Sequence, residues 1–335
     1  MDFEKQNDEL FEKISKLISH VWSNGYDKRN VDIWLNNFDG SCFDKDYEKF
    51  LALFLLSHFL YFNQDMVRQM LAFAYTELFV IPLKQKIRKE LNNTLNSYEI
   101  NKKFEAELES TLFIGAGNPS ESGAHLLYFF RQINNLSKEH FSDFYGMFTE
   151  HEYQIDSISM GLEIQTDIEL SKNRQDINKI VFFDDLIGSG TQMKLYLEKR
   201  LIAIRKIDPE IDIQLISLFA TEKGLNLINE KDMFNGKARS LFLLDDSFKA
   251  FNIESRNFKS ELDATKPIKE PSLEDLEKFC KYYGEKLWSG ENALGYKNNQ
   301  LMIGFSYNTP DNTLPIFWCN YNGWKPIFPR FSKIY

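Results

Sequence analysis

A short stretch in the second half of the chain places two carboxylates directly before a glycine-rich loop. Residues 179–192 read K-I-V-F-F-D-D-L-I-G-S-G-T-Q. The apolar run predicts a buried parallel strand, and the amphipathic segment that follows predicts a helix whose N-terminus faces the loop. Glycine backbone, hydroxyl groups and the unpaired N–H groups of a helix N-terminus together bind anions. The loop therefore predicts a phosphate site, formed by Gly188, Ser189, Gly190, Thr191 and Gln192.

The two carboxylates, Asp184 and Asp185, stand where the predicted strand ends. Carboxylate pairs suit the vicinal hydroxyls of a sugar, or a hydrated Mg²⁺ ion, better than they suit a phosphate. A sugar site beside a phosphate site predicts a sugar-phosphate ligand. The alternative is structural, in that the acids cap the next helix and the glycines form an ordinary turn.

This pattern resembles the ribose-phosphate-binding motif of the type I phosphoribosyltransferases. The resemblance implies that Asp184 and Asp185 are the catalytic-site acids that bind the ribose 2′- and 3′-hydroxyls, and that residues 188–192 bind the 5′-phosphate. It also implies Mg²⁺ as a cofactor, held near the same two acids through the ligand. The chain departs from the motif at Gln192, where the family has Thr, and at Gly188, where purine-salvage members carry a base-contacting Asp. The second departure argues against purine salvage.

An earlier segment has a related pattern. Residues 111–123 read T-L-F-I-G-A-G-N-P-S-E-S-G and precede an apolar segment with helical spacing. In type I phosphoribosyltransferases a loop of this kind follows the first strand and binds pyrophosphate. The resemblance assigns that role to Gly115, Ala116, Gly117 and Ser120. The family often has Lys or Arg in this loop, whereas this chain has Glu121 and no basic residue. The alternative is a tight turn between strand and helix, with Ser120 as the N-cap.

Composition limits the classes of function. The chain has 335 residues, 43% of them hydrophobic, and a formal net charge of −9. The basic cluster at 84–89 is short, so a broad nucleic-acid-binding face is not expected. Cys42, Cys280 and Cys319 lie too far apart in sequence for a zinc motif or a disulfide framework. The charged start has no secretory pattern. The apolar run 50–62 is shorter than the roughly 20 residues of a membrane helix. We expect a cytoplasmic protein without a membrane segment, in which 50–62 is a helix of the core or faces a partner.

The pattern along the chain predicts an α/β fold with a mostly parallel, doubly wound sheet of the type I phosphoribosyltransferase kind. Residues 1–105 predict an α-helical lobe, 106–260 the α/β core, and 261–335 a C-terminal helix followed by a loop-rich segment. The strands are expected at 111–114, 179–184, 211–219 and 239–244, and the helices of the core at 122–134, 191–206 and 224–229. The polar stretch 137–175 has no clear pattern, and its elements are left open.

The C-terminal segment is rich in aromatic, Asn and Pro residues. Type I phosphoribosyltransferases cover their site with a variable hood, and this resemblance implies hood contacts from Asn308, Asn312 and Trp318. The alternative is a rigid turn whose aromatic rings pack as core.

Taken as a whole, the chain is most similar to the phosphoribosyltransferase-like effector domains of bacterial conflict and anti-phage systems. The similarity implies an effector that binds phosphoribosyl pyrophosphate or a nucleotide, transfers or cleaves the ribosyl-phosphate group, and is regulated by a partner protein or by a second copy of the chain. A second hypothesis is a sensor without catalytic activity, which binds the same ligand and signals to a partner. The retained acids favour the enzyme, and the absence of a basic residue from the first loop favours the sensor.

Overall fold

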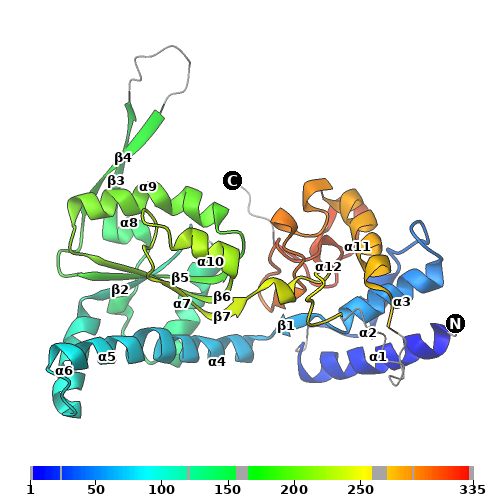
Figure 1. Cartoon of the computed structure of the whole chain (residues 1–335), viewed down its shortest axis with the longest axis horizontal. Helices are drawn as coiled ribbons and strands as arrows, with labels where there is room; N and C mark the ends of the chain where they lie inside the picture. The colour runs from blue at the N-terminus through cyan, green and yellow to red at the C-terminus, as the bar shows by residue number, and fades with distance from the viewer. Residues whose placement is uncertain are drawn as a thin grey trace. The chain divides into compact units, whose positions relative to one another are not determined.

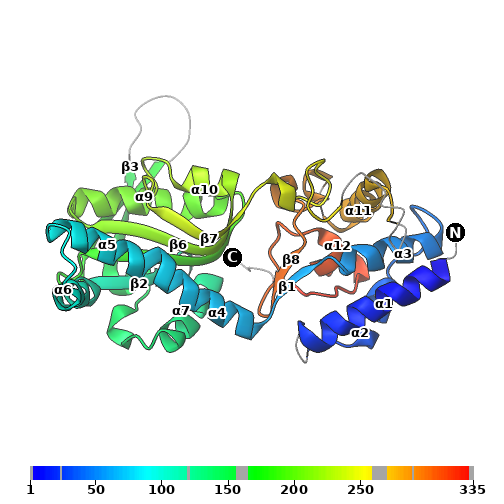
Figure 2. The ribbon, with the colours of Figure 1, turned by 60° about the horizontal axis from the view of Figure 1, so that its bottom comes forward.

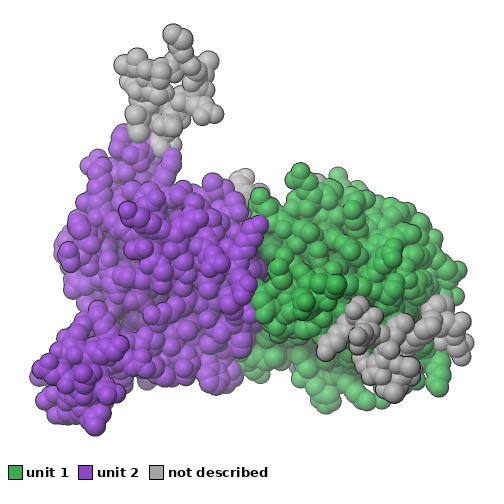
Figure 3. All heavy atoms as spheres, in the orientation of Figure 1, with its two compact units in different colours: residues 1–67, 244–335 green, residues 68–243 purple. Residues whose placement is uncertain are grey.

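The computed structural model of the chain (Figure 1) describes residues 3–22, 25–118, 121–155, 165–258, 270–288 and 290–331. The described residues form two compact units (Figure 3). Unit 2 is the continuous stretch 68–243, whereas unit 1 combines residues 1–67 with residues 244–335. Each unit has its own hydrophobic core.

Unit 2 is built around a four-stranded sheet in the order β2-β5-β6-β7. The strands are β2 (Thr111–Gly115), β5 (Lys179–Ile187), β6 (Asp212–Thr221) and β7 (Ala238–Leu244). β5 runs parallel to β2 and to β6, so it is a central strand. All of β2 and the first five residues of β5 are buried. A parallel strand that is covered on both faces needs such a continuous apolar run, and this confirms the predicted mixed α/β fold with a mostly parallel sheet.

Helices cover both faces of this sheet, with α9 and α10 on one side and α4, α5 and α7 on the other (Figures 1 and 2). The helices of unit 2 and its short helical turns are α4 (Gln64–Ala74, whose first residues belong to unit 1), η1 (Tyr75–Val80), α5 (Ile81–Glu90), α6 (Ser97–Glu109), α7 (Ser122–Ile133), η2 (Lys138–His140), α8 (Phe144–Met147), α9 (Thr191–Ile207) and α10 (Glu222–Ile228).

The stretch Gln64–Glu90 is one continuous helical run that contains the π-helical turn η1. By length and composition alone it could cross a membrane. Two of its aromatic side chains instead pack inside unit 2, because Phe79 lies on Phe113 of β2 with ring centroids 5.2 Å apart and Tyr75 lies on Phe130 of α7 at 5.6 Å. A helix of this kind is the usual cover of an α/β sheet.

The stretch 137–175, for which the sequence predicted no elements, contains an antiparallel ribbon. β3 (Phe148–Ile155) pairs with β4 (Gln165–Lys172), and the pair extends away from the sheet of unit 2 (Figure 1). The ribbon is tied to α9 by Arg200, whose Nε and Nη2 atoms donate to the two carboxylate oxygens of Glu150 at 2.7 and 2.9 Å.

Unit 1 contains the remaining elements: α1 (Phe3–His20), α2 (Lys28–Leu35), α3 (Lys45–Leu56), β1 (Leu60–Phe62), η3 (Asp246–Phe248), α11 (Leu273–Leu287), η4 (Gly290–Asn292), η5 (Tyr296–Asn298), β8 (Ile303–Phe305), α12 (Pro315–Trp318) and η6 (Tyr321–Gly323). α3 is its central helix, and every residue of 50–56 is buried. The two segments of unit 1, 1–67 and 244–335, pair with each other through β1, which runs parallel to β8.

This organisation differs from the boundaries expected at 105 and 260. The first 67 residues pack with the last 92 rather than with the next helices, because β1 pairs with β8 and α3 packs against α11. The prediction of a helix over the apolar run 50–62 is wrong at its end, since α3 stops at Leu56 and residues 60–62 form a strand. Ser57 Oγ donates to the carbonyl of Phe54 there, at 2.9 Å.

Candidate ribose-phosphate site

The acids and the glycine loop lie at the carboxyl end of β5, as predicted. Burial along the strand is complete up to Phe183 and becomes partial at Asp184, Asp185 and Leu186. Because helices cover both faces of the sheet, β5 must be apolar along most of its length, and only its end can carry polar side chains. In parallel α/β sheets this edge is where ligands bind.

Both acids are held in place by local hydrogen bonds. Asp184 Oδ1 accepts from the backbone N–H of Asp185 at 3.0 Å, and Asp185 Oδ1 accepts from the N–H of Leu186 at 2.8 Å. Asp185 Oδ1 also accepts from Ser122 Oγ at 3.0 Å. Ser122 is the first residue of α7, so the two sequence motifs meet at Asp185. The sequence reasoning did not single out Ser122.

The loop after β5 remains non-helical up to Gly190, and α9 begins at Thr191. Gly190 has φ 74° and is the N-cap of this helix. Within the described part of the chain, the backbone N–H groups of Ser189 and Gly190 donate no hydrogen bond, whereas the N–H of Thr191 donates to Ser189 Oγ at 3.3 Å. Backbone N–H groups that have no acceptor, at the positive end of a helix dipole, form an anion site.

Hydrogen bonds from the β6–α10 connection hold this loop in place. Thr221, the last residue of β6, donates through Oγ1 to the carbonyl of Gly188 at 2.6 Å and accepts from the N–H of Gly224 at 2.9 Å. A Cβ atom at Gly190 would lie 3.0 Å from the carbonyl oxygen of Gly224. Thr221 was missed from the sequence, although a Thr at a strand end followed by Glu and Lys is a recognisable N-cap.

The loop after β2 is tight because glycine allows α7 to approach the sheet. A Cβ atom at Gly115 would lie 2.7 Å from the backbone nitrogen of Ala124, and one at Gly123 would lie 2.6 Å from the carbonyl oxygen of Phe183. The N–H of Ala116 donates to that same carbonyl at 2.9 Å. Ser120, the fourth residue assigned to this loop, lies outside the described residues.

Further along α9, Tyr196 and Arg200 lie beside the ribbon. The guanidinium of Arg200 stacks 4.3 Å from the centroid of the Tyr196 ring. The Tyr196 hydroxyl is buried and has no hydrogen-bond partner among the described residues. Burial raises the pKa of this hydroxyl, so Tyr196 is a neutral phenol at physiological pH.

The predicted hood residues, Asn308, Asn312 and Trp318, belong to unit 1. Trp318 Nε1 donates to the carbonyl of Thr313 at 2.8 Å, Asn308 Oδ1 accepts from the N–H of Phe331 at 3.1 Å, and Asn312 is 6% exposed. These contacts fit the rigid-turn alternative. Hood contacts with a ligand stay a prediction.

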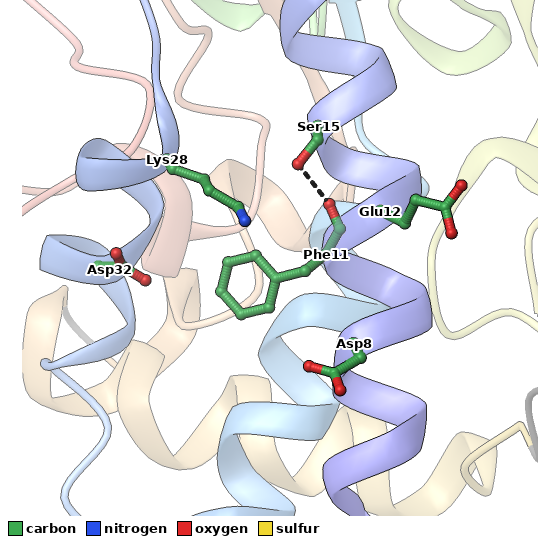
Figure 4. Close-up of a pocket in the computed structure, with 6 residues that line it drawn as sticks. All are labelled: Asp8, Phe11, Glu12, Ser15, Lys28 and Asp32. Atoms are coloured by element: carbon green, nitrogen blue, oxygen red, sulfur yellow. Dashed lines mark hydrogen bonds between the residues drawn. The ribbon is translucent and has the colours of Figure 1, made fainter.

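A groove of about 380 Å³ lies between α1 and α2 in unit 1 (Figure 4). It is lined by Asp8, Phe11, Glu12, Ser15, Lys28 and Asp32. The Lys28 ammonium lies 5.8 Å from the centroid of the Phe11 ring.

Among the described residues, no group of three or more His, Cys, Asp or Glu side chains could hold a metal ion. A Mg²⁺ ion at Asp184 and Asp185 would therefore take further oxygen ligands from water and from the bound phosphate compound, as Mg²⁺ commonly does.

Comparison with known proteins gives the family. A family model described as PRTase-CE matches residues 31–330. The chain belongs to the PRTase-CE family. No curated protein matches it.

Two solved structures resemble this PRTase-CE chain at 13% sequence identity. The Helicobacter pylori xanthine-guanine-hypoxanthine phosphoribosyltransferase has a TM-score of 0.22, with 51% of this chain and 84% of that chain covered. The AQ2163 protein from Aquifex aeolicus has a TM-score of 0.27, with 66% and 85% covered. Neither similarity bears on what this chain binds.

The family confirms the predicted relationship to the phosphoribosyltransferases, and the sheet of unit 2 has the expected α/β character. The residues predicted for the acid pair and the phosphate loop lie at one strand end, next to the loop after β2. Their roles in binding remain predictions.

Proposed function

We propose that unit 2 binds a ligand that carries a ribose 5-phosphate group and breaks the bond at its anomeric carbon. The single observation that carries this proposal is the end of β5, where Asp184 and Asp185 precede a loop with undonated N–H groups at Ser189 and Gly190. The 17-residue helix α9 begins directly after that loop. Family membership supports the same class of ligand.

Each part of the strand end has a role in this proposal. The 5′-phosphate accepts hydrogen bonds from the amides of Ser189 and Gly190 and from the hydroxyls of Ser189 and Thr191, and the helix dipole of α9 favours its negative charge. Gln192, the first exposed residue of the helix, contributes a side-chain amide. Asp184 and Asp185 accept hydrogen bonds from the ribose 2′- and 3′-hydroxyls. Ser122 positions Asp185 through its 3.0 Å hydrogen bond.

The reaction is a substitution at C1 of the ribose. The bond from C1 to the leaving group breaks and its electron pair departs with that group. A lone pair of the acceptor, or of water, then forms the new bond to C1, and the acceptor releases its proton to solvent. Mg²⁺, when bound with the ligand, stabilises the negative charge on phosphate oxygens. The protein fixes the ribose at two ends, which holds C1 in place while positive charge develops on the ring.

In its cellular role, the protein is proposed to be a toxic effector of anti-phage defence that acts in the cytoplasm. It would be regulated by a partner protein of the same system or by a second copy of the chain, and it would bind neither membrane nor nucleic acid directly. The support for this role is the resemblance in sequence to phosphoribosyltransferase-like effector domains. The net charge of −9 fits the absence of a nucleic-acid-binding face.

A second candidate function is a sensor that binds the ligand without turnover. One observation favours it, since the loop after β2 has no basic residue to stabilise a departing pyrophosphate. The enzyme is the preferred function because the paired acids are retained together with the phosphate loop.

The test is calorimetric titration of the full chain with ribose 5-phosphate, phosphoribosyl pyrophosphate and nucleoside monophosphates, with and without Mg²⁺. Saturable binding of 5′-phosphorylated ribosyl compounds, and not of ribose or adenosine, supports the proposal. Binding of none of these ligands by the folded protein refutes it. Chromatography of the incubated mixtures then separates the two candidates, because release of the C1 substituent identifies an enzyme and an intact ligand identifies a sensor.

A further inference from the structure

The loop after β2 contains a carboxylate where a pyrophosphate-binding loop has basic groups. Glu121 is the N-cap residue of α7, yet its side chain makes no capping hydrogen bond to that helix. The carboxylate lies instead against Gly117, since a Cβ atom added to Gly117 would overlap Glu121 Oε2. The side chain is thus directed over the glycine loop.

The position of Glu121 is set by the tight packing of α7. Gly115 and Gly123 let the first turn of this helix approach the ends of β2 and β5. Added Cβ atoms would lie only 2.7 Å from the Ala124 nitrogen and 2.6 Å from the Phe183 carbonyl oxygen. The same turn brings Ser122 to Asp185. Glu121 therefore begins the helix immediately beside the residue that orients the second ribose-binding acid.

Two backbone amides of the same loop are engaged, one near each of its ends. The N–H of Ala116 donates to the carbonyl of Phe183 at 2.9 Å, and the N–H of Glu121 donates to the carbonyl of Asn118 at 2.9 Å. The loop after β5 differs in this respect, because the amides of Ser189 and Gly190 donate to no described residue. The sequence between Thr111 and Phe130 contains no Lys or Arg. One loop is thus suited to an anion, and the other presents a negative charge.

We propose that Glu121 is a specificity-determining residue of the ribose-phosphate site and disfavours a pyrophosphate on C1 of the ribose. The substrate class is then a 5-phosphoribosyl compound whose C1 substituent is uncharged or cationic, such as an N-linked heterocycle. A carboxylate beside that substituent repels a pyrophosphate but accepts hydrogen bonds from N–H groups or attracts a positive charge. This inference rests on the proposed function, because it assumes that the loop after β5 binds the 5′-phosphate.

The test compares two ligands on the full-length chain. Binding of ribose 5-phosphate and of phosphoribosyl pyrophosphate is measured by calorimetry in the presence of Mg²⁺, for the wild type, for Glu121→Gln and for the control Glu99→Gln. Glu99 is an exposed acid in the first turn of α6, in the same unit. The measured quantity is the ratio of the affinity for phosphoribosyl pyrophosphate to the affinity for ribose 5-phosphate. Thermal melting shows that the variants are folded.

Glu121→Gln should raise this ratio by more than about threefold, because the substitution removes a charge that repels the multiply charged pyrophosphate. Glu99→Gln should leave the ratio unchanged. A rise smaller than about threefold, or a fall, overturns the role of Glu121 even though the site binds ribose 5-phosphate. If neither ligand binds to the wild type, the proposed function itself fails, and the inference fails with it.

Discussion

At the scale of single residues, Gly190 is subject to two constraints at once. Its φ of 74° lies in the left-handed region, which L side chains rarely adopt. In addition, a Cβ atom would lie 3.0 Å from the carbonyl oxygen of Gly224. From the sequence, a side chain at this position is expected either to intrude on the anion or to force an unfavourable backbone angle, and the observed φ agrees with the second reason. A side chain at this position would point toward α10, where there is no room for it. A substitution would therefore act on phosphate binding by displacing the loop.

Gly236 is a matched control for this residue. It has a similar φ of 77°, but an added Cβ atom would meet nothing within 4 Å. Gly236→Ala should cost about 1 kcal/mol of unfolding free energy from backbone strain alone. Gly190→Ala should cost roughly 1–3 kcal/mol more, because the loop must also move from α10. Urea denaturation measures both. Equal costs for the two variants would show that the contact with α10 has no effect.

At the scale of elements, α9 connects the phosphate loop with the β3–β4 ribbon. The first residue of the helix follows Gly190, and about two and a half turns later Arg200 binds Glu150 on β3 with two hydrogen bonds. The side chains of Arg200 and Glu150 are only 15% and 8% exposed. Removal of one partner from such a pair leaves a buried charge without compensation.

Arg200→Met should therefore destabilise the protein by about 3 kcal/mol and increase hydrogen exchange in β3 and β4. Arg174→Met is the control, because its pair with Asp176 has side chains that are 38% and 59% exposed. An exposed pair contributes less than about 1 kcal/mol. Denaturation midpoints and exchange rates are the measurements. Similar losses for both variants would contradict the assigned role of Arg200.

Some elements were predictable because the chain pattern alone determines them. β2, β5 and α9 follow from apolar runs that end at glycine loops, and the acid pair follows from β5. The ribbon was not predictable, since exposed polar residues such as His151 and Glu152 interrupt any apolar alternation along β3. Ser122 and Thr221 were missed for a different reason. They act on the site from other strands and helices, and a linear pattern does not show which segments meet in space.

At the scale of the whole molecule, unit 2 is continuous in sequence and unit 1 is assembled from two segments. The apolar run 50–62 illustrates this, since its helical part is completely buried in unit 1 and its end pairs with β8. A unit made of distant segments cannot be recognised by a change in composition at a single boundary. The expected boundaries at 105 and 260 therefore missed the division.

This division predicts which fragments fold. Residues 68–243 should give a soluble fragment with a cooperative melting transition, because they contain the sheet and the helices that cover it. Residues 105–335 should be insoluble or molten. That fragment lacks Tyr75 and Phe79, which pack on α7 and on β2, and lacks α3 from the core of unit 1. Circular dichroism melts of both fragments are the measurement. A cooperative melt for 105–335 would contradict the assignment of α4 and α5 to the core of unit 2.

The central claim is that the acids at the end of β5 bind ribose. Asp184→Asn combined with Asp185→Asn is the direct test, and the chain offers a matched control in Asp245 and Asp246, a second acid pair that follows the apolar strand β7. Asp245 has a local role, because its Oδ1 accepts from the N–H of Ser247 at 2.9 Å. The control pair has no glycine loop after it.

The measurement is calorimetric titration of the wild type and of both double variants with ribose 5-phosphate. Loss of charge-assisted hydrogen bonds at Asp184 and Asp185 should cost roughly 1.5–3 kcal/mol for each acid, which abolishes measurable binding. The variant Asp245→Asn with Asp246→Asn should bind like the wild type. Wild-type affinity in a folded Asp184→Asn, Asp185→Asn double variant would contradict the ribose assignment.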